Sequence, residues 1–115
     1  MAYPLGSRHH IAHGAANALI FPHVLAFNAP AVPEKTALVL EALGLPAAQE
    51  PAAVLAAAGG WCRALGCEMK LSAYNVPRDD LPVMASEAHA IRRLLDNNPR
   101  DLSRDEILAI YQSAY

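Results

Sequence analysis

Apolar residues recur at spacings of three and four along most of this chain, which is the period of a helix face. The clearest series is Leu81, Met84, Ala88, Ile91 and Leu95, with spacings of 3, 4, 3 and 4. No segment alternates apolar and polar residues as a half-buried strand would. The pattern predicts an all-α fold, a compact bundle of about five main helices in one domain, residues 1–115. The predicted helices span residues 13–27, 33–43, 51–65, 78–95 and 103–111.

Capping residues and helix breakers suggest where these helices begin and end. Pro33 suits the first turn of the second helix, and Gly44 suits the left-handed residue that follows its end. Ser103 and Glu106 form a capping-box pattern at the start of the last helix. The Gly59–Gly60 pair costs about 1 kcal/mol per glycine relative to alanine. We therefore expect the third helix to be bent or split at this pair.

The longest apolar run, residues 15–27, predicts a central buried helix. Asn17, Pro22 and His23 interrupt the run, and it is shorter than the ~20 residues of a membrane span. Pro22 removes one backbone hydrogen bond and is expected to bend this helix. At His23 we expect a core histidine with a hydrogen-bond partner, because leaving a buried imidazole unpaired costs about 1–3 kcal/mol. The N-terminus has no secretory signal pattern, so no membrane association is expected.

Composition and charge narrow the classes of function. With 54% hydrophobic and 17% charged residues, the chain is predicted to fold and not to be disordered. The formal net charge is −2 and the basic residues are scattered, which argues against a nucleic-acid partner. Cys62 and Cys67 match neither a CxxC redox pair nor a zinc knuckle. Two reduced thiols and a cytoplasmic location are therefore expected.

Three histidines near the N-terminus form a cluster that could ligate a metal. On a continuous helix, His9 and His13 would lie four residues apart on one face, with His10 beside them. Such a spacing can supply ligands to one transition metal. Nearby proline and glycine residues instead favour a loop over residues 7–12, where helical spacing does not apply. In that structural interpretation His9 and His10 are solvated, and His13 caps a helix or bonds a carbonyl; the residues alone leave both interpretations open.

A longer pattern surrounds these histidines. The segment AYPLGSRHHIAHGAANALIFPHVLAFNAPAVPEK contains P-L-G, then H-G-x-x-N-A, an apolar run and P-H-V-x-x-F-N. The segments LGCEMKLSAYNVPRDDLPVMASEA and NNPRDLSRDEILAIYQSAY extend the pattern to the C-terminus. In all three, the chain resembles the C-terminal helical domain of the iron-containing (group III) alcohol dehydrogenases and the related maleylacetate reductases. The resemblance covers essentially all 115 residues.

The resemblance implies a metal-ligating role for one of the three histidines. Members of the family hold iron or zinc with one Asp and three His, and the last of these His matches His13. His9 and His10 match a variable loop, so the resemblance gives them no ligand role. Tyr3 takes a place where many members carry a histidine beside the reacting carbon. Tyr3 and His9 are therefore candidates for the substrate cleft, whereas His23 matches a histidine to which we assign a structural role.

Most of the family's catalytic apparatus has no counterpart in these residues. In the family, an N-terminal α/β domain binds NAD(P), and the other metal ligands lie upstream of the matching segment. No G-x-G-x-x-G or comparable phosphate-binding loop occurs here. We predict no catalytic residue and no NAD(P) site in the chain. Any Fe(II) or Zn(II) site is expected to be incomplete, because a catalytic metal needs at least three protein ligands.

Three hypotheses about function follow. In the first, the chain is a stand-alone module without dehydrogenase activity that binds a ligand or partner. Its simplest assembly is a homodimer across the face that the nucleotide domain covers in relatives. In the second, it is half of a split NAD(P)-dependent and metal-dependent alcohol dehydrogenase, with a separate nucleotide-binding chain. In the third, it is a small metal-binding protein built on His9, His10 and His13.

Overall fold

The computed structural model describes all 115 residues and contains helices without any strand, which confirms the predicted all-α class. In chain order the elements are α1 (Ala2–His9), α2 (His13–Asn28), α3 (Pro33–Ala42), α4 (Pro51–Ala64), the 3-10 turns η1 (Leu71–Tyr74) and η2 (Arg78–Asp80), α5 (Leu81–Ala90), α6 (Arg92–Leu95) and α7 (Arg104–Ser113). The five longest helices, α2, α3, α4, α5 and α7, correspond to the five that the sequence predicts.

Several predicted helix boundaries are confirmed. Pro33 opens α3, and Gly44 follows its end with a φ of 72°. At the start of α7, the Ser103 hydroxyl accepts a hydrogen bond from the Glu106 backbone, and the Glu106 carboxylate accepts one from the Ser103 backbone. The expected split at Gly59–Gly60 does not occur, because α4 runs through this pair without interruption.

Two boundaries differ from the sequence prediction. Residues 2–9 form α1, so the loop expected over residues 7–12 is shorter and begins at His10. Pro4 is compatible with this helix because it lies in the first turn, where backbone N–H groups have no partner within the helix. The predicted helix over 78–95 is interrupted at Ile91, whose ψ of 69° is not helical. Periodicity missed this interruption because the buried residues before it, Met84 and Ala88, and after it, Leu95, keep a helical spacing.

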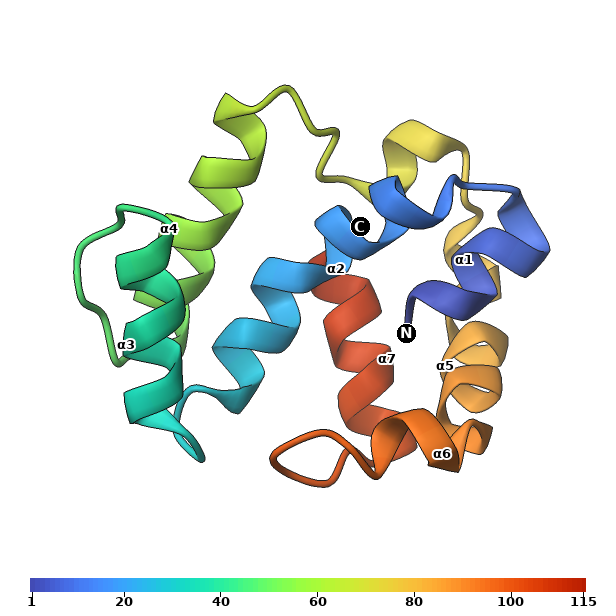
Figure 1. Cartoon of the computed structure of the whole chain (residues 1–115). Helices are drawn as coiled ribbons and strands as arrows, with labels where there is room; N and C mark the ends of the chain where they lie inside the picture. The colour runs from blue at the N-terminus through green and yellow to red at the C-terminus, as the bar shows by residue number, and fades with distance from the viewer.

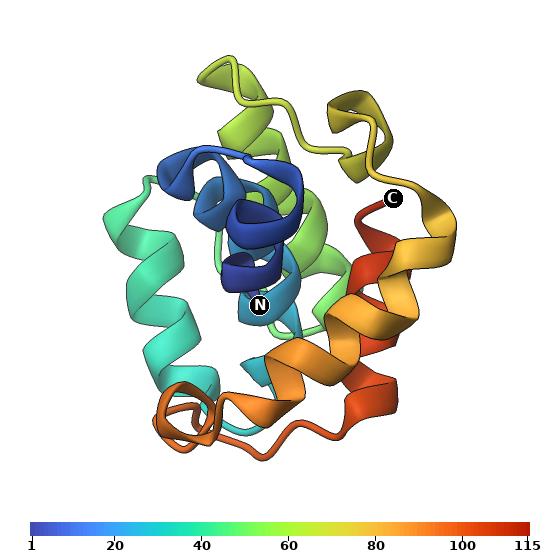
Figure 2. The ribbon, with the colours of Figure 1, turned by 90° about the vertical axis from the view of Figure 1, so that its right-hand side faces the viewer.

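The larger lobe of the molecule is built from α1, α5, α6 and α7 around the N-terminal half of α2 (Figures 1 and 2). Its core is a cluster of 17 buried residues. The largest fully buried side chains of this cluster are Leu5, Leu19, Leu71, Leu81, Met84, Leu102, Ile107 and Tyr111. The Tyr111 hydroxyl donates a hydrogen bond to the Met1 carbonyl, which ties α7 to the start of α1. This lobe therefore joins both ends of the chain in one core.

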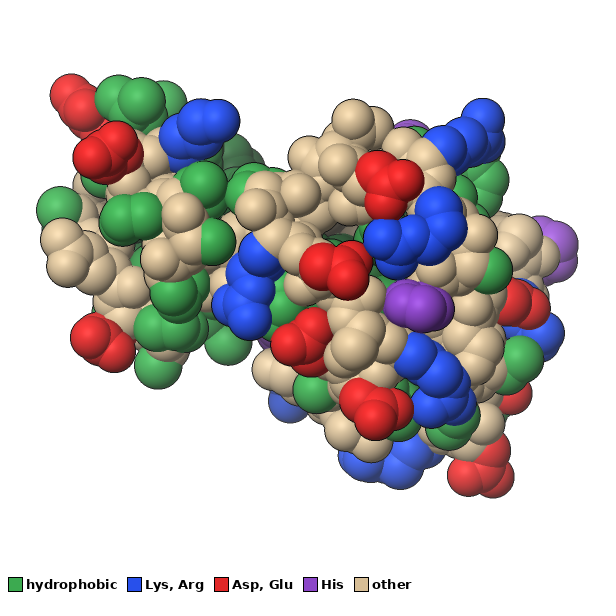
Figure 3. All heavy atoms as spheres, turned by 90° about the horizontal axis from the view of Figure 1, so that it is seen from below, with side chains coloured by type: hydrophobic (Ala, Val, Ile, Leu, Met, Phe, Trp, Pro, Cys, Tyr) green, Lys and Arg blue, Asp and Glu red, His purple; other side chains and the backbone are tan.

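The smaller lobe consists of α3 and α4 packed on the C-terminal half of α2 (Figure 1). Its core is a cluster of four buried residues, Ala26, Ala29, Leu40 and Val54. Figure 3 shows this lobe standing out from the larger one, with an indentation between them and many hydrophobic side chains on its surface. Leu38 and Leu65 are 65% and 63% exposed. The smaller lobe thus buries its apolar residues far less completely.

A polar clasp holds the C-terminal end of α2 to the segment after α6. Asn28 and Asn98 exchange two side-chain hydrogen bonds, both 2.8 Å long. Nearby, the Arg100 guanidinium donates to the Phe27 carbonyl at 2.9 Å and lies over the Phe27 ring at 3.9 Å from its centroid. These contacts satisfy carbonyl and amide groups that would otherwise be left unpaired at the helix end.

No helix of the structure combines the length and the apolar character that crossing a bilayer requires.

Candidate functional site

His13, the predicted metal ligand, is the first residue of α2 and lies exposed at its N-terminal end. Its Nε2 atom is 3.0 Å from the Nδ2 atom of Asn17, one turn further along the helix. In the tautomer with an unprotonated Nε2, the Asn17 amide donates to this nitrogen. The Asn17 contact orients the ring, and the exposed imidazole remains accessible from outside the chain.

His9 and His10 point into different surroundings. His9 ends α1 with its side chain 13% exposed, and its Nε2 lies 3.2 Å from the Oδ2 atom of Asp80. That contact is close, but it lacks the alignment of a hydrogen bond, and this buried nitrogen has no other partner. His10 is exposed and adopts the left-handed conformation, with φ 55°. Its backbone N–H caps α1 by donating to the Gly6 carbonyl at 3.1 Å.

The three histidines therefore do not come together as one group of ligands. No three His, Cys, Asp or Glu side chains lie where they could together hold a metal ion. An iron or zinc site with at least three protein ligands does not fit these residues alone. His13 can contribute at most one ligand to a site that other residues complete.

Tyr3, the other candidate for a substrate cleft, lies on α1 and is 53% exposed. The three main cavities of the molecule are lined by other residues and include neither Tyr3, His9 nor His13. The assignment of Tyr3 and His9 to a substrate cleft stays a prediction.

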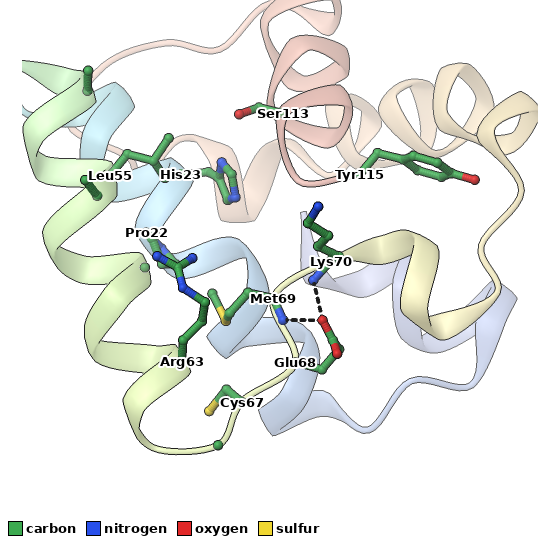
Figure 4. Close-up of a pocket in the computed structure, with 14 residues that line it drawn as sticks. Pro22, His23, Leu55, Arg63, Cys67, Glu68, Met69, Lys70, Ser113 and Tyr115 are labelled. Atoms are coloured by element: carbon green, nitrogen blue, oxygen red, sulfur yellow. Dashed lines mark hydrogen bonds between the residues drawn. The ribbon is translucent and has the colours of Figure 1, made fainter.

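The largest cavity, about 700 Å³, opens between the two lobes. Its wall comes from α2, α4, the connector after α4 and the C-terminal end (Figure 4). The residues that line it are Pro22, His23, Ala52, Leu55, Ala56, Gly59, Arg63, Gly66, Cys67, Glu68, Met69, Lys70, Ser113 and Tyr115. The apolar part of the wall is mainly Ala52, Leu55 and Ala56 on α4. Polar side chains come from every segment and include His23 on α2 and Arg63 on α4.

His23 belongs to this cavity and not to the core, which corrects the sequence prediction. Its side chain is only partly buried, and its ring makes no hydrogen bond to the protein. The reason is that α4 and α7, which lie on either side of this face of α2, do not close over it. Burial lowers the pKa of His23 below its ordinary value, so its ring is neutral at pH 7.

The sequence reasoning missed Arg63 and Lys70, which meet His23 around this cavity. The only local feature near either residue is the Gly59–Gly60 pair, which lies one turn before Arg63 and does not by itself indicate a cavity.

A second apolar groove, about 490 Å³ in volume, runs along another face of α2. This face is the one that begins with Asn17, the neighbour of His13, and continues through Phe21 and Val24. Leu94, on α6, lines the groove and is 46% exposed. α2, although apolar on nearly all sides, is therefore open to solvent on two faces.

Comparisons with known proteins agree with this architecture. The sequence model described as "Fe-containing alcohol dehydrogenase family, C-terminal" matches residues 1–115. Sulfoacetaldehyde reductase of Bilophila wadsworthia is 40% identical over 113 residues, covering 92% of this chain and 29% of that protein. Lactaldehyde reductase of Escherichia coli K12 is 30% identical over 127 residues, covering 100% of this chain and 31% of that protein.

A solved structure of a 1,3-propanediol oxidoreductase superposes with a TM-score of 0.84 at 32% identity. The match covers 99% of this chain and 31% of that one. The chain thus spans about three tenths of the length of these relatives. The chain belongs to the iron-containing alcohol dehydrogenase family and corresponds to its C-terminal, all-helical part.

Proposed function

We propose that these 115 residues act as the partner-binding helical part of an alcohol or aldehyde oxidoreductase and carry out no hydride transfer by themselves. The observation that carries this proposal is the isolation of His13. It is accessible at the end of α2, yet no second and third ligand lies beside it. A catalytic metal takes at least three protein ligands. The remaining ligands and the nucleotide site therefore come from another polypeptide segment.

The surface around His13 supports a partner role. The groove of about 490 Å³ continues from Asn17 along the face of α2 and is lined mainly by apolar side chains. A helix that is apolar on all sides is ordinarily buried, so this open face is suited to burial against another segment. A nucleotide-binding segment seated there would bring its own ligands towards His13. A second copy of the chain is the alternative occupant, and it would produce a homodimer.

A complementation assay tests the proposal. The chain is combined with the part of the Bilophila wadsworthia sulfoacetaldehyde reductase that lies outside the matched 113 residues. Fe(II) or Zn(II), NADH or NADPH, and sulfoacetaldehyde are added, and loss of nucleotide absorbance is followed. We expect no turnover with the chain alone and turnover with the combination. His13→Ala should abolish the activity, whereas His10→Ala, a matched change at an exposed histidine, should retain it.

Two results would count against the proposal. Turnover by the isolated chain would disprove its inactivity. A failure of the two parts to associate, seen by size-exclusion chromatography with light scattering, would disprove the nucleotide-binding partner. Native mass spectrometry with Fe(II) or Zn(II) addresses the alternatives in one spectrum. A metal-free dimer would favour the homodimer, and one tightly held metal per chain would revive the histidine-cluster hypothesis.

A further inference from the structure

Two cations at the cavity between the lobes lack a carboxylate partner. Most arginines of the larger lobe form ion pairs, such as Arg8 with Glu87 at 2.7 Å and Arg92 with Asp96 at 2.9 Å. Arg63 and Lys70, which line the cavity, form none. Unpaired positive charges facing a partly apolar hollow are a feature of sites that bind anions.

The Arg63 side chain lies against the surface of α4 at the glycine pair. A Cβ atom at Gly59 would lie 3.4 Å from the Nη1 atom of Arg63, and one at Gly60 would lie 3.9 Å from its Nη2 atom. The guanidinium therefore folds back over the bare surface of the helix. Figure 4 shows it directed along α4 towards Pro22. The Arg63 guanidinium is thus a donor group held beside α4 at the cavity wall.

The side chains that line the cavity leave one of these two positive charges uncompensated. The Glu68 carboxylate accepts hydrogen bonds from its neighbours' backbone, from Met69 N at 3.0 Å and Lys70 N at 3.2 Å. Lys70 extends from the connector towards the space between His23 and Tyr115 (Figure 4). The two cations thus outnumber the single Glu68 carboxylate among the side chains of the cavity wall.

We propose that this cavity binds a small organic carboxylate with an apolar body. The planar guanidinium of Arg63 matches a carboxylate in a two-point contact, and Lys70 adds a second positive charge. Pro22 and Leu55 offer an apolar surface to the alkyl body. The volume of about 700 Å³ is within the range of about 300–1,000 Å³ typical of small-molecule sites. This site lies apart from His13 and requires neither a metal nor a nucleotide-binding partner, so it goes beyond the proposed function.

Titration with sodium hexanoate tests the proposal, followed by ¹H–¹⁵N NMR of the full chain. We expect saturable shifts for the amides of residues 63–70 and of Ser113. 1-Hexanol, with a similar body and no charge, should bind at least about tenfold more weakly. Arg63→Gln should weaken hexanoate binding by about tenfold or more, because it removes a charge-assisted hydrogen bond.

Arg93→Gln is the matched control, because it removes the same charge from an exposed residue of α6. It should leave hexanoate binding unchanged. The proposal is overturned if hexanol binds as well as hexanoate, if both arginine variants weaken binding equally, or if no saturable shift occurs. Circular dichroism of both variants verifies that they are folded. Failure of the complementation assay would not produce any of these results, so the two proposals can fail separately.

Discussion

The two lobes of this molecule differ in how completely they enclose their apolar residues. The larger lobe buries a cluster of 17 residues and joins both ends of the chain. The smaller lobe buries four residues, of which Ala26 comes from α2 and Ala29 from its C-terminal cap, and it leaves Leu38 and Leu65 largely exposed. The main cavity and its free cations lie along the inner side of the smaller lobe. The larger lobe therefore holds most of the buried core, whereas the smaller lobe leaves more of its apolar surface open to solvent.

The largest effect is expected from Ile107→Ala in the larger lobe. Ile107 lies on α7 and is 0% exposed. The substitution leaves a cavity in a well-packed core, which costs about 2–5 kcal/mol of the free energy of unfolding. Urea unfolding followed by circular dichroism measures the loss. A cost below about 1 kcal/mol would mean that the larger core is looser than the structure indicates.

Leu40→Ala tests the smaller lobe with an equally buried residue, also 0% exposed. Its cluster has few neighbours and can collapse more easily, so we expect a cost near the lower end, about 2 kcal/mol. Native-state hydrogen exchange should show faster exchange in α3 and α4 and little change in α7. Equal acceleration in α7 would show that the lobes unfold as one unit, and the comparison would fail.

Gly59→Ala should stabilise the smaller lobe by about 0.5–1 kcal/mol, because alanine favours the helix interior. The added Cβ would meet only the mobile end of Arg63, at 3.4 Å. Gly66→Ala is the contrasting variant, because Gly66 has a φ of 85°. It should destabilise by about 1–2 kcal/mol. Thermal unfolding compares the Tm values of the two variants. A lowered Tm for Gly59→Ala would show that an alanine side chain does not fit at this position.

The smallest effect concerns pH and His23. Burial lowers its pKa in the folded protein from the ordinary value of 6.5. At a pH between the folded-state pKa of His23 and its unfolded-state pKa of about 6.5, the unfolded chain binds more protons than the folded one. The free energy of unfolding therefore falls as the pH drops below about 6.5. The stability that depends on a neutral His23 ring is fully lost once the pH is below the folded-state pKa of His23. His23→Gln should flatten this dependence in urea midpoints measured from about pH 7.5 to pH 5, and parallel curves for the two proteins would contradict it.

Most of the fold could be predicted because helix signals are local. Pro33, Gly44 and the Ser103 capping box act within a few residues, and the structure follows them. The sequence does not predict α1 because proline and glycine near residues 7–12 favour a loop, although the first turn of a helix tolerates Pro4. The interruption at Ile91 leaves the spacing of buried residues unchanged, so periodicity contains no trace of it.

The candidate sites were harder to predict because they depend on tertiary contacts. The position of His13 at a helix start follows from its neighbours in sequence, and the structure places it there. The cavity instead combines His23, Arg63 and Lys70 from three separate segments. Their approach depends on how α4 and the connector pack against α2, which no local pattern specifies. The same limit applies to the contact between His9 and Asp80, because these two residues lie 71 positions apart in the sequence.

The paired amides of Asn28 and Asn98 have a topological consequence. The chain between them forms the whole smaller lobe and then returns through η1, η2, α5 and α6, so these amides close a ring of which the smaller lobe is one part. Lengthening a loop within such a ring changes its closure entropy only slowly, by about 0.6 kcal/mol for each doubling of its length. Insertions or deletions in the loop between α3 and α4 therefore leave the ring shut. The length of the chain can therefore vary in the loop between α3 and α4 while the rest of the molecule keeps its shape.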